Sequence, residues 1–242
     1  MFVINCFSNP KVKAVQTTRR GGVSQKPYDS MNLGVNTEDS NVPDNLKILT
    51  KKANLPMTPK FLSQVHGKKA IEYTETPKSH GEHLADACFA RNHESICAIL
   101  TADCLPILLS SKTQDYVAAI HCGWQGLYQN LIEETLTASS INGEDIEAWL
   151  GPCISYKAYQ VGEDFRQKFV ESDKSYAHAF YQDKKNNWHA DLKKIAIIQL
   201  EKLGVTQITQ APFCTYDNKD LFYSYRKNKI TGRMASLIWL ET

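Results

Sequence analysis

Three short segments of the chain carry side chains that could bind a metal ion or act as nucleophiles. They are SQVHG with His66, TADCLP with Cys104, and AIHCGW with His121. Each residue stands at the expected end or break of a strand, beside glycine or near proline. Zinc takes imidazole nitrogen and thiolate sulfur, and a catalytic zinc commonly keeps three protein ligands and one open position. These residues are therefore candidate ligands of one metal ion.

The spacing of these residues leaves other roles open. Cys104 follows His66 by 38 residues and precedes His121 by 17, which matches no zinc-ribbon pattern. The same atoms would also serve a cysteine hydrolase, in which His121 activates Cys104 as a nucleophile. A loop histidine, a packed thiol and a hydrogen-bonded core histidine are the purely structural alternative.

The segment HCGWQG places two reactive side chains next to each other, at His121 and Cys122. Neighbouring residues of a strand point to opposite faces of a sheet, so the two are not expected to serve one metal together. We expect His121 to be the ligand and Cys122 to be a packed thiol. The pair His80 and His83 flanks Gly81 in a segment typical of an exposed loop, and we assign it no role.

Arginines supply candidate anion sites. Arg19 lies at the end of a predicted strand, before Gly21 and Gly22, and Arg226 and Arg233 flank the turn in SYRKNKITGR. Arginine suits two-point contact with phosphate or carboxylate, and solvated charge is the alternative role. A helix expected to start at Gly126 would also present free N–H groups to an anion. The aromatic residues of segment 222–225 would either stack on a ring or pack in the core.

Hydrophobic patterning predicts the elements that position these residues. Strands are expected over 11–19, the two halves of 96–110, 116–120, 147–151, 205–209 and 234–241, and helices over 42–55, 126–139, 161–170 and 191–204. Pro106 argues against one continuous strand over 96–110, so a break is expected around Ala102–Pro106. Asp103 and Cys104 then lie at an irregular point inside the core. Strands and helices mix without strict alternation, which favours an α+β fold or an irregular sandwich.

Composition limits the classes of protein. The chain has 242 residues with a formal net charge of +2, and we expect residues 1–242 to form one domain. Lysine and arginine are scattered, which argues against a nucleic acid or a membrane surface as partner. Seven cysteines without an export signal predict reduced thiols and a cytoplasmic protein. We expect a monomer or a weak homo-oligomer.

Seven motifs in a fixed order carry a family resemblance. They are TTRRGGVSQKPYDSMNLG, QVHG, TADCLPILL, IHCGWQGL, LGPCIS, CTY and FYSYRKNKITGRMASLIWL. From about residue 2 to residue 240, the chain resembles the laccase-domain family of the YfiH type. That family is described both as polyphenol oxidases and as purine nucleoside phosphorylases with adenosine deaminase activity.

The resemblance implies a fold and a site. The fold is α+β, a layered α/β/α-type domain with a mixed sheet that is similar to deamidating toxins. The metal, usually zinc and alternatively copper, would be held by His66, Cys104 and His121. The substrates would be a purine nucleoside and phosphate, and the expected substrate or phosphate contacts are Arg19, Gln64, Arg226 and Arg233. Apart from the resemblance, we expect Asp103, from its place at the predicted strand break, either to move a proton or to have a purely backbone role there.

Other activities remain open at this point. One is a metal-independent Cys/His amide hydrolase, acting for example on peptidoglycan precursors, and another is a copper-dependent polyphenol oxidase. With seven histidines and no His-X-His pair, the chain does not favour a four-copper laccase. A nucleoside-binding module without turnover is the non-enzymatic alternative. The family motif HAGWRG reads HCGWQG here, and Gln125 in place of arginine makes the phosphorylase assignment less secure than the metal site.

Overall fold

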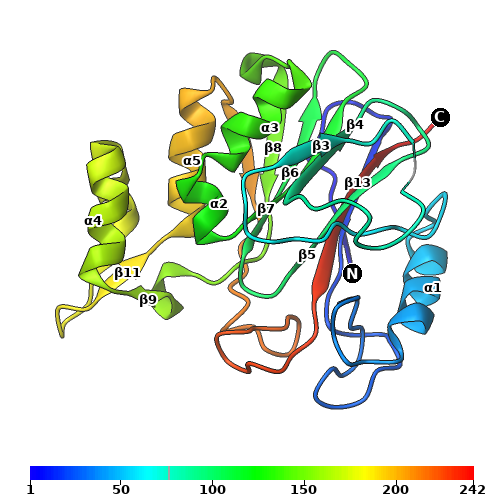
Figure 1. Cartoon of the computed structure of the whole chain (residues 1–242), viewed down its shortest axis with the longest axis horizontal. Helices are drawn as coiled ribbons and strands as arrows, with labels where there is room; N and C mark the ends of the chain where they lie inside the picture. Colours follow the sequence, from blue (N-terminus) through cyan, green and yellow to red (C-terminus); the bar gives the residue numbers. More distant parts are fainter. Residues whose placement is uncertain (76) are drawn as a thin grey trace.

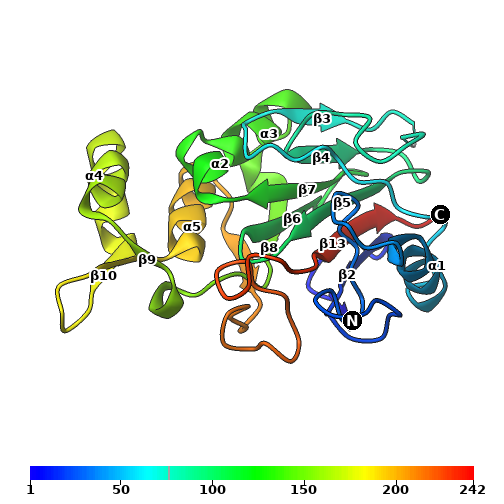
Figure 2. The same ribbon diagram turned by 60° about the horizontal axis from the view of Figure 1, so that its bottom comes forward.

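Two β-sheets lie face to face in the middle of the molecule, with helices on their outer sides (Figures 1 and 2). The computed structural model describes residues 1–75 and 77–242. Within that part of the chain, the larger sheet has, in spatial order, β12 (Gln207–Gln210), β8 (Ile146–Leu150), β6 (Leu105–Ser111), β7 (Val117–Cys122), β4 (Ala87–Ala90) and β3 (Ala70–Glu72). The smaller sheet has β1 (Phe2–Val3), β2 (Val12–Gln16), β13 (Met234–Leu240) and β5 (Ile96–Thr101).

Helices cover both outer faces. The larger sheet carries α2 (Trp124–Tyr128), α3 (Leu131–Ser139) and α5 (Leu192–Lys202), and the smaller sheet carries α1 (Val42–Lys52) (Figure 1). A third sheet of β10 (Phe180–Gln182), β11 (Trp188–Ala190) and β9 (Gln160–Val161) lies beside α4 (Glu163–Ser172), at the left of Figure 1. Short 3-10 helices span Gly143–Asp145, Tyr156–Ala158 and Lys174–Ala179. None of the helices described here is long and apolar enough to cross a membrane.

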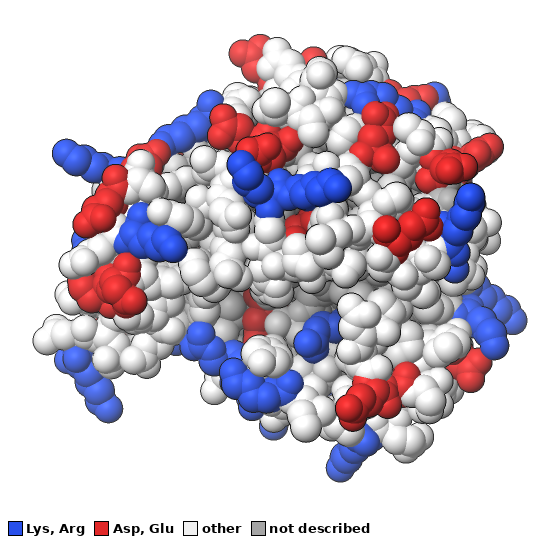
Figure 3. Space-filling view, in the orientation of Figure 1, with Lys and Arg blue, Asp and Glu red and all other residues white. Residues whose placement is uncertain are grey.

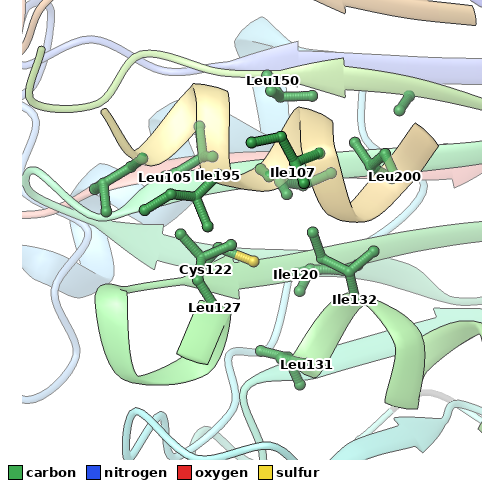
Figure 4. Close-up of a cluster of buried hydrophobic side chains, with 14 of the residues drawn as sticks. Leu105, Ile107, Ile120, Cys122, Leu127, Leu131, Ile132, Leu150, Ile195 and Leu200 are labelled. Atoms are coloured by element: carbon green, nitrogen blue, oxygen red, sulfur yellow. The ribbon is translucent and has the colours of Figure 1, made fainter. Parts of the chain in front are cut away.

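The main core lies between the larger sheet and its helices. Figure 4 shows the strand residues Leu105, Ile107, Ile120 and Leu150 facing Leu127, Leu131, Ile132, Ile195 and Leu200 of the helices. The other face of β6 and β7 packs on the smaller sheet, so both strands are buried on both sides. That is why their sequences are continuously apolar rather than alternating. Cys122 is fully buried in the main core, which confirms that it is a packed thiol.

The predicted break in segment 96–110 is confirmed. β5 ends at Thr101 and β6 begins at Leu105, and Pro106 is the second residue of β6. Asp103 lies in the break with a φ angle of +93°, in the left-handed region that non-glycine residues seldom adopt. The turn therefore has an irregular backbone held by side-chain contacts, as described below.

One long helix over 126–139 was a wrong prediction. Asn130 has a φ angle of +57° and separates α2 from α3, and asparagine tolerates this left-handed conformation better than most residues. α2 also begins at Trp124 rather than at Gly126, with Gly123 as its N-cap. Gly126 is therefore the third residue of this short helix rather than its start, and the first hydrogen bond of the helix runs from the backbone N–H of Leu127 to the carbonyl oxygen of Gly123.

The α+β class with a mixed sheet is confirmed, because β12 and β3 run parallel to their neighbours while the inner strands of the larger sheet are antiparallel. The layers are helix, sheet, sheet and helix, so the middle layer of the predicted α/β/α arrangement consists of two packed sheets. The HGEH segment lies outside helices and strands, as expected, although the rings of His80 and His83 are half-buried.

Candidate metal centre

His66, Cys104 and His121 come together at the end of the larger sheet. Their ligand atoms all lie within 4.8 Å of one another, and Sγ of Cys104 is 3.8 Å from Nε2 of His66. The register of β6 and β7, which pairs Pro106 with His121, places the turn before β6 beside the end of β7. His66 reaches the same point from the loop that precedes β3, and its ring meets that of His121 edge-on at 4.8 Å between centroids.

Asp86 is a functional candidate that the sequence did not reveal. This residue is fully buried directly before β4, and its Oδ1 accepts a hydrogen bond of 2.9 Å from Nδ1 of His121. Nε2 of His121 is therefore left for the cluster with Cys104. A signal was present, since Asp86 is the one acidic residue in the otherwise apolar run LADACFA. A buried acid needs a partner.

The donor set fits a metal ion. A tetrahedral zinc with bonds of about 2.0–2.3 Å holds its nitrogen and sulfur ligands roughly 3.3–3.6 Å apart. The 3.8 Å between Cys104 and His66 and the 4.8 Å limit for the cluster require only a small contraction. A carboxylate on the second nitrogen of a metal-binding histidine, as Asp86 provides for His121, is the usual arrangement.

The cluster carries paired charges without a metal. Burial raises the pKa of the Cys104 thiol, but His121 and His66 outweigh it and lower the pKa to about 6. Burial lowers the pKa of His121, but Cys104 and Asp86 outweigh it and raise the pKa to about 9. Without a metal, each of Cys104 and His121 thus favours the charged form of the other. Thiolate is also the form that binds metal.

A cavity of about 430 Å³ opens onto the cluster, within the range usual for small-molecule sites. Figure 3 shows a hollow near the centre of this face of the molecule, with lysine and arginine side chains gathered below it. Besides the cluster itself, the polar and aromatic lining residues are Asn36, Thr37, Gln64, Thr101, Tyr225 and Arg233. Both hydrogen-bond donors and a ring surface are thus available to a ligand.

Arg233 is the predicted anion contact that the structure brings to this cavity. Its side chain is largely buried, and burial lowers its pKa. One terminal nitrogen donates to the carbonyl oxygens of Thr231 and Gly232 at 2.9 and 3.0 Å. Over residues 1–75 and 77–242, no carboxylate lies within ion-pair distance of Arg233. A largely buried cation without a carboxylate partner suits an anionic ligand.

The other two predicted arginines lie outside the cavity lining. Arg19 forms an ion pair of 3.2 Å with Asp29 and stacks over the ring of Tyr223 at 4.8 Å. Arg226 lies over the ring of Tyr159 at 5.0 Å, and its guanidinium donates to the carbonyl oxygen of Gln160. Arg19 is therefore engaged in holding loops together.

Asp103 and Gln64 are occupied by the protein itself. The carboxylate of Asp103 accepts from the hydroxyls of Thr215 and Ser224 at 2.6 and 2.9 Å and from the backbone N–H of Arg226 at 2.7 Å. The amide of Gln64 exchanges two hydrogen bonds of 2.8 Å with the backbone of Leu100. Both side chains position the walls of the site.

Of the aromatic segment 222–225, Phe222 and Tyr223 are fully buried and pack in the core. Tyr225 is 46% exposed and lines the cavity, so it is the ring available to a ligand. Gln125, which replaces the arginine of the family motif, is exposed on α2 and does not line the cavity.

Fold and site define a class of protein in which two packed sheets place two histidines and a cysteine at the base of a cavity. The chain belongs to the family described as multi-copper polyphenol oxidoreductase laccase, whose model matches residues 13–241. The resemblance found in the sequence is thereby confirmed.

Curated relatives and a solved structure agree with this assignment. The chain is 42% identical over 241 residues to "Purine nucleoside phosphorylase YfiH" of Escherichia coli K12, with 98% of each chain covered. It is also 42% identical to "Purine nucleoside phosphorylase" of Haemophilus influenzae, with 95% of each covered. The crystal structure of a Neisseria meningitidis protein matches with a TM-score of 0.93 at 35% identity, covering 100% of this chain and 99% of that one.

Proposed function

We propose that the protein is a metal-dependent purine nucleoside phosphorylase, which converts adenosine or inosine and phosphate to the free base and ribose 1-phosphate. Deamination of adenosine is the accompanying reaction. The names of the relatives support this activity, and the observation that carries it is the convergence of His66, Cys104 and His121 beneath a cavity that also holds Arg233. Zinc is the expected metal, with copper as the alternative.

The chain's own residues supply the binding groups. Arg233, held by the backbone carbonyl oxygens of Thr231 and Gly232, presents its remaining N–H groups to phosphate and fixes its orientation. Tyr225 offers its exposed ring to the purine. Phosphorolysis builds up negative charge on the departing base, while the phosphate anion forms its bond to the ribose. The guanidinium of Arg233 is a cation already fixed in the cavity, and it therefore favours the reaction.

His66, Cys104 and His121 would hold the metal, which when bound supplies a Lewis acid that polarises a water or a substrate atom. Asp86 keeps a proton on Nδ1 of His121, so that Nε2 is the free ligand atom. Asp103 fixes the loop that carries Arg226 and leads to Arg233.

The test is a product profile. Purified protein of known zinc content is incubated with adenosine, with and without phosphate, and adenine, inosine and ribose 1-phosphate are measured. We expect ribose 1-phosphate only with phosphate, and inosine in both cases. If zinc-loaded protein forms none of the three, the proposal is wrong.

A second candidate function is metal-independent amide hydrolysis. It is favoured by one observation, the row formed by Asp86, His121 and Cys104, in which the pKa of the thiol is about 6 and that of the imidazole about 9. This row matches the nucleophile, base and orienting group of cysteine hydrolases. Full activity after exhaustive chelation would support it against the phosphorylase.

A further inference from the structure

The carboxylate of Asp86 accepts four hydrogen bonds, two on each oxygen. Oδ1 accepts from Nδ1 of His121 and from the backbone N–H of His66, both at 2.9 Å. Oδ2 accepts from the backbone N–H groups of Val65 and Gly67 at 3.1 and 2.7 Å. One fully buried side chain thus contacts both candidate histidine ligands, one through its ring and the other through its backbone.

The hydrogen bonds to the loop explain an unusual backbone. His66 has a φ angle of +60°, in the left-handed region, which costs free energy for a residue other than glycine. Three successive N–H groups then converge on one point, which is a concave anion-binding arrangement of the backbone. Here the anion is the carboxylate of Asp86. The loop around His66 is therefore held in this conformation by the same group that orients His121.

We propose that Asp86 is the positioning residue that sets both histidine ligands of the metal centre, so that the geometry at His66 and His121 depends on one carboxylate. The inference rests on the metal site of the proposed function, and it adds an element to that site. Because Nδ1 of His121 donates to Asp86, Nε2 is the atom presented to Cys104 and His66. Because the backbone of residues 65–67 closes around Asp86, the ring of His66 is carried to the same point.

The substitution Asp86→Asn separates this role from a general structural one. Asparagine has nearly the same shape, but one of the two oxygens becomes an N–H₂ donor that faces two donors of the protein. Whichever way the amide turns, it loses either the pair to Val65 and Gly67 or the pair to His66 and His121. The matched control is Glu147→Gln, since Glu147 is also buried and accepts a backbone hydrogen bond, from Ser8 at 2.7 Å, without touching a histidine.

The experiment is titration of the metal-free proteins with cobalt(II), followed by the thiolate-to-cobalt absorption band, with the folded fraction measured by circular dichroism. We expect Asp86→Asn to bind cobalt about 10- to 100-fold more weakly than wild type, since loss of an outer partner of a metal-binding histidine has this effect. Glu147→Gln should bind as wild type does. Equal affinity in Asp86→Asn, counted per folded molecule, would overturn the inference and leave the proposed function intact.

If the wild-type protein binds no cobalt, both the metal dependence in the proposed function and this inference are wrong. A second measurement on the wild-type protein covers the case in which Asp86→Asn does not fold. Nitrogen-15 NMR of the zinc-loaded protein should show His121 with a proton on Nδ1 and the metal on Nε2. Metal on Nδ1, or a proton absent from Nδ1, would overturn the inference.

Discussion

The backbone of Gly123 lies so close to His66 that a Cβ atom at residue 123 would be 2.9 Å from the ring carbon Cδ2 of His66. The same atom would lie 3.2 Å from Sγ of Cys104. The glycine of HCGW therefore leaves the space in which the two ligands meet. Glycine is needed at this position for the space beside the cluster and not for its backbone conformation, because its φ angle of −69° is open to any residue.

We therefore expect Gly123→Ala to displace His66 or Cys104 and to weaken metal binding by at least tenfold, while the protein still folds. A Cβ contact below 3.0 Å forces a shift of the neighbouring ring. The measurement is a zinc competition titration. Gly126→Ala is the control, because its Cβ meets the flexible end of Leu131 at 3.3 Å and the backbone oxygen of His121 only at 3.4 Å, touches no ligand side chain, and should leave zinc affinity unchanged. Unaltered affinity in Gly123→Ala would show that the cluster has more room than the structure gives it.

Cys104 should be the reactive thiol of the metal-free protein. Its pKa of about 6 lies below the usual value, so the thiolate fraction, and with it the rate of alkylation by iodoacetamide, should rise through about pH 6 and level off above pH 7. Cys122 should remain unmodified, because burial raises its pKa well above the usual value. Peptide mass spectrometry at each pH measures both, and bound zinc should protect Cys104. A midpoint near 8.5 would mean that the histidines do not stabilise the thiolate.

Arg233→Gln should raise the KM for phosphate by roughly 10- to 100-fold, the range expected for losing hydrogen bonds from a charged group. Steady-state kinetics at varied phosphate concentration measure the change. Arg19→Gln is the matched control, because Arg19 is paired with Asp29 outside the cavity and should leave this KM unchanged. A raised KM for phosphate in Arg19→Gln, with an unchanged KM in Arg233→Gln, would place the phosphate beside Arg19 instead.

Asp103→Asn distinguishes a positioning role from proton transfer. Three donors converge on the carboxylate, so the amide should lower the free energy of unfolding by about 2–4 kcal/mol, as for buried hydrogen bonds to a charged group. Urea unfolding measures this, with Asp115→Asn in an exposed ion pair to Lys11 as a control expected to change it by less than about 1 kcal/mol. A loss of kcat without a loss of stability would instead support the proton-transfer role.

Much of the fold and part of the site follow from the sequence. The strand break at residues 102–104, shortly before Pro106, and the packed thiol of Cys122 were predictable, because proline and strand alternation act locally. The end of α2 was not, because Asn130 interrupts an otherwise continuous helical pattern with one left-handed residue. Asp86 was missed because its four partners come from distant segments, and only the fold brings them together.

The arginines show the same limit. Arg19 and Arg233 have similar surroundings in the sequence, each within two residues of a glycine and a threonine. In the fold, Arg19 meets Asp29, whereas Arg233 meets no carboxylate in the described part of the chain. Whether an arginine is free to bind a ligand depends on which carboxylates the fold brings next to it, and this cannot be predicted from the neighbouring residues in the sequence.

The central claim is that a metal at His66, Cys104 and His121 is required for phosphorolysis. The most direct measurement pairs elemental analysis with ribose 1-phosphate production from adenosine and phosphate, for wild type, Cys104→Ala and the control Cys6→Ala, whose thiol is also half-buried. We expect about one zinc per chain and phosphate-dependent activity in wild type and Cys6→Ala, with both lost in Cys104→Ala. Wild-type protein that contains no metal and still forms ribose 1-phosphate after chelation would contradict it.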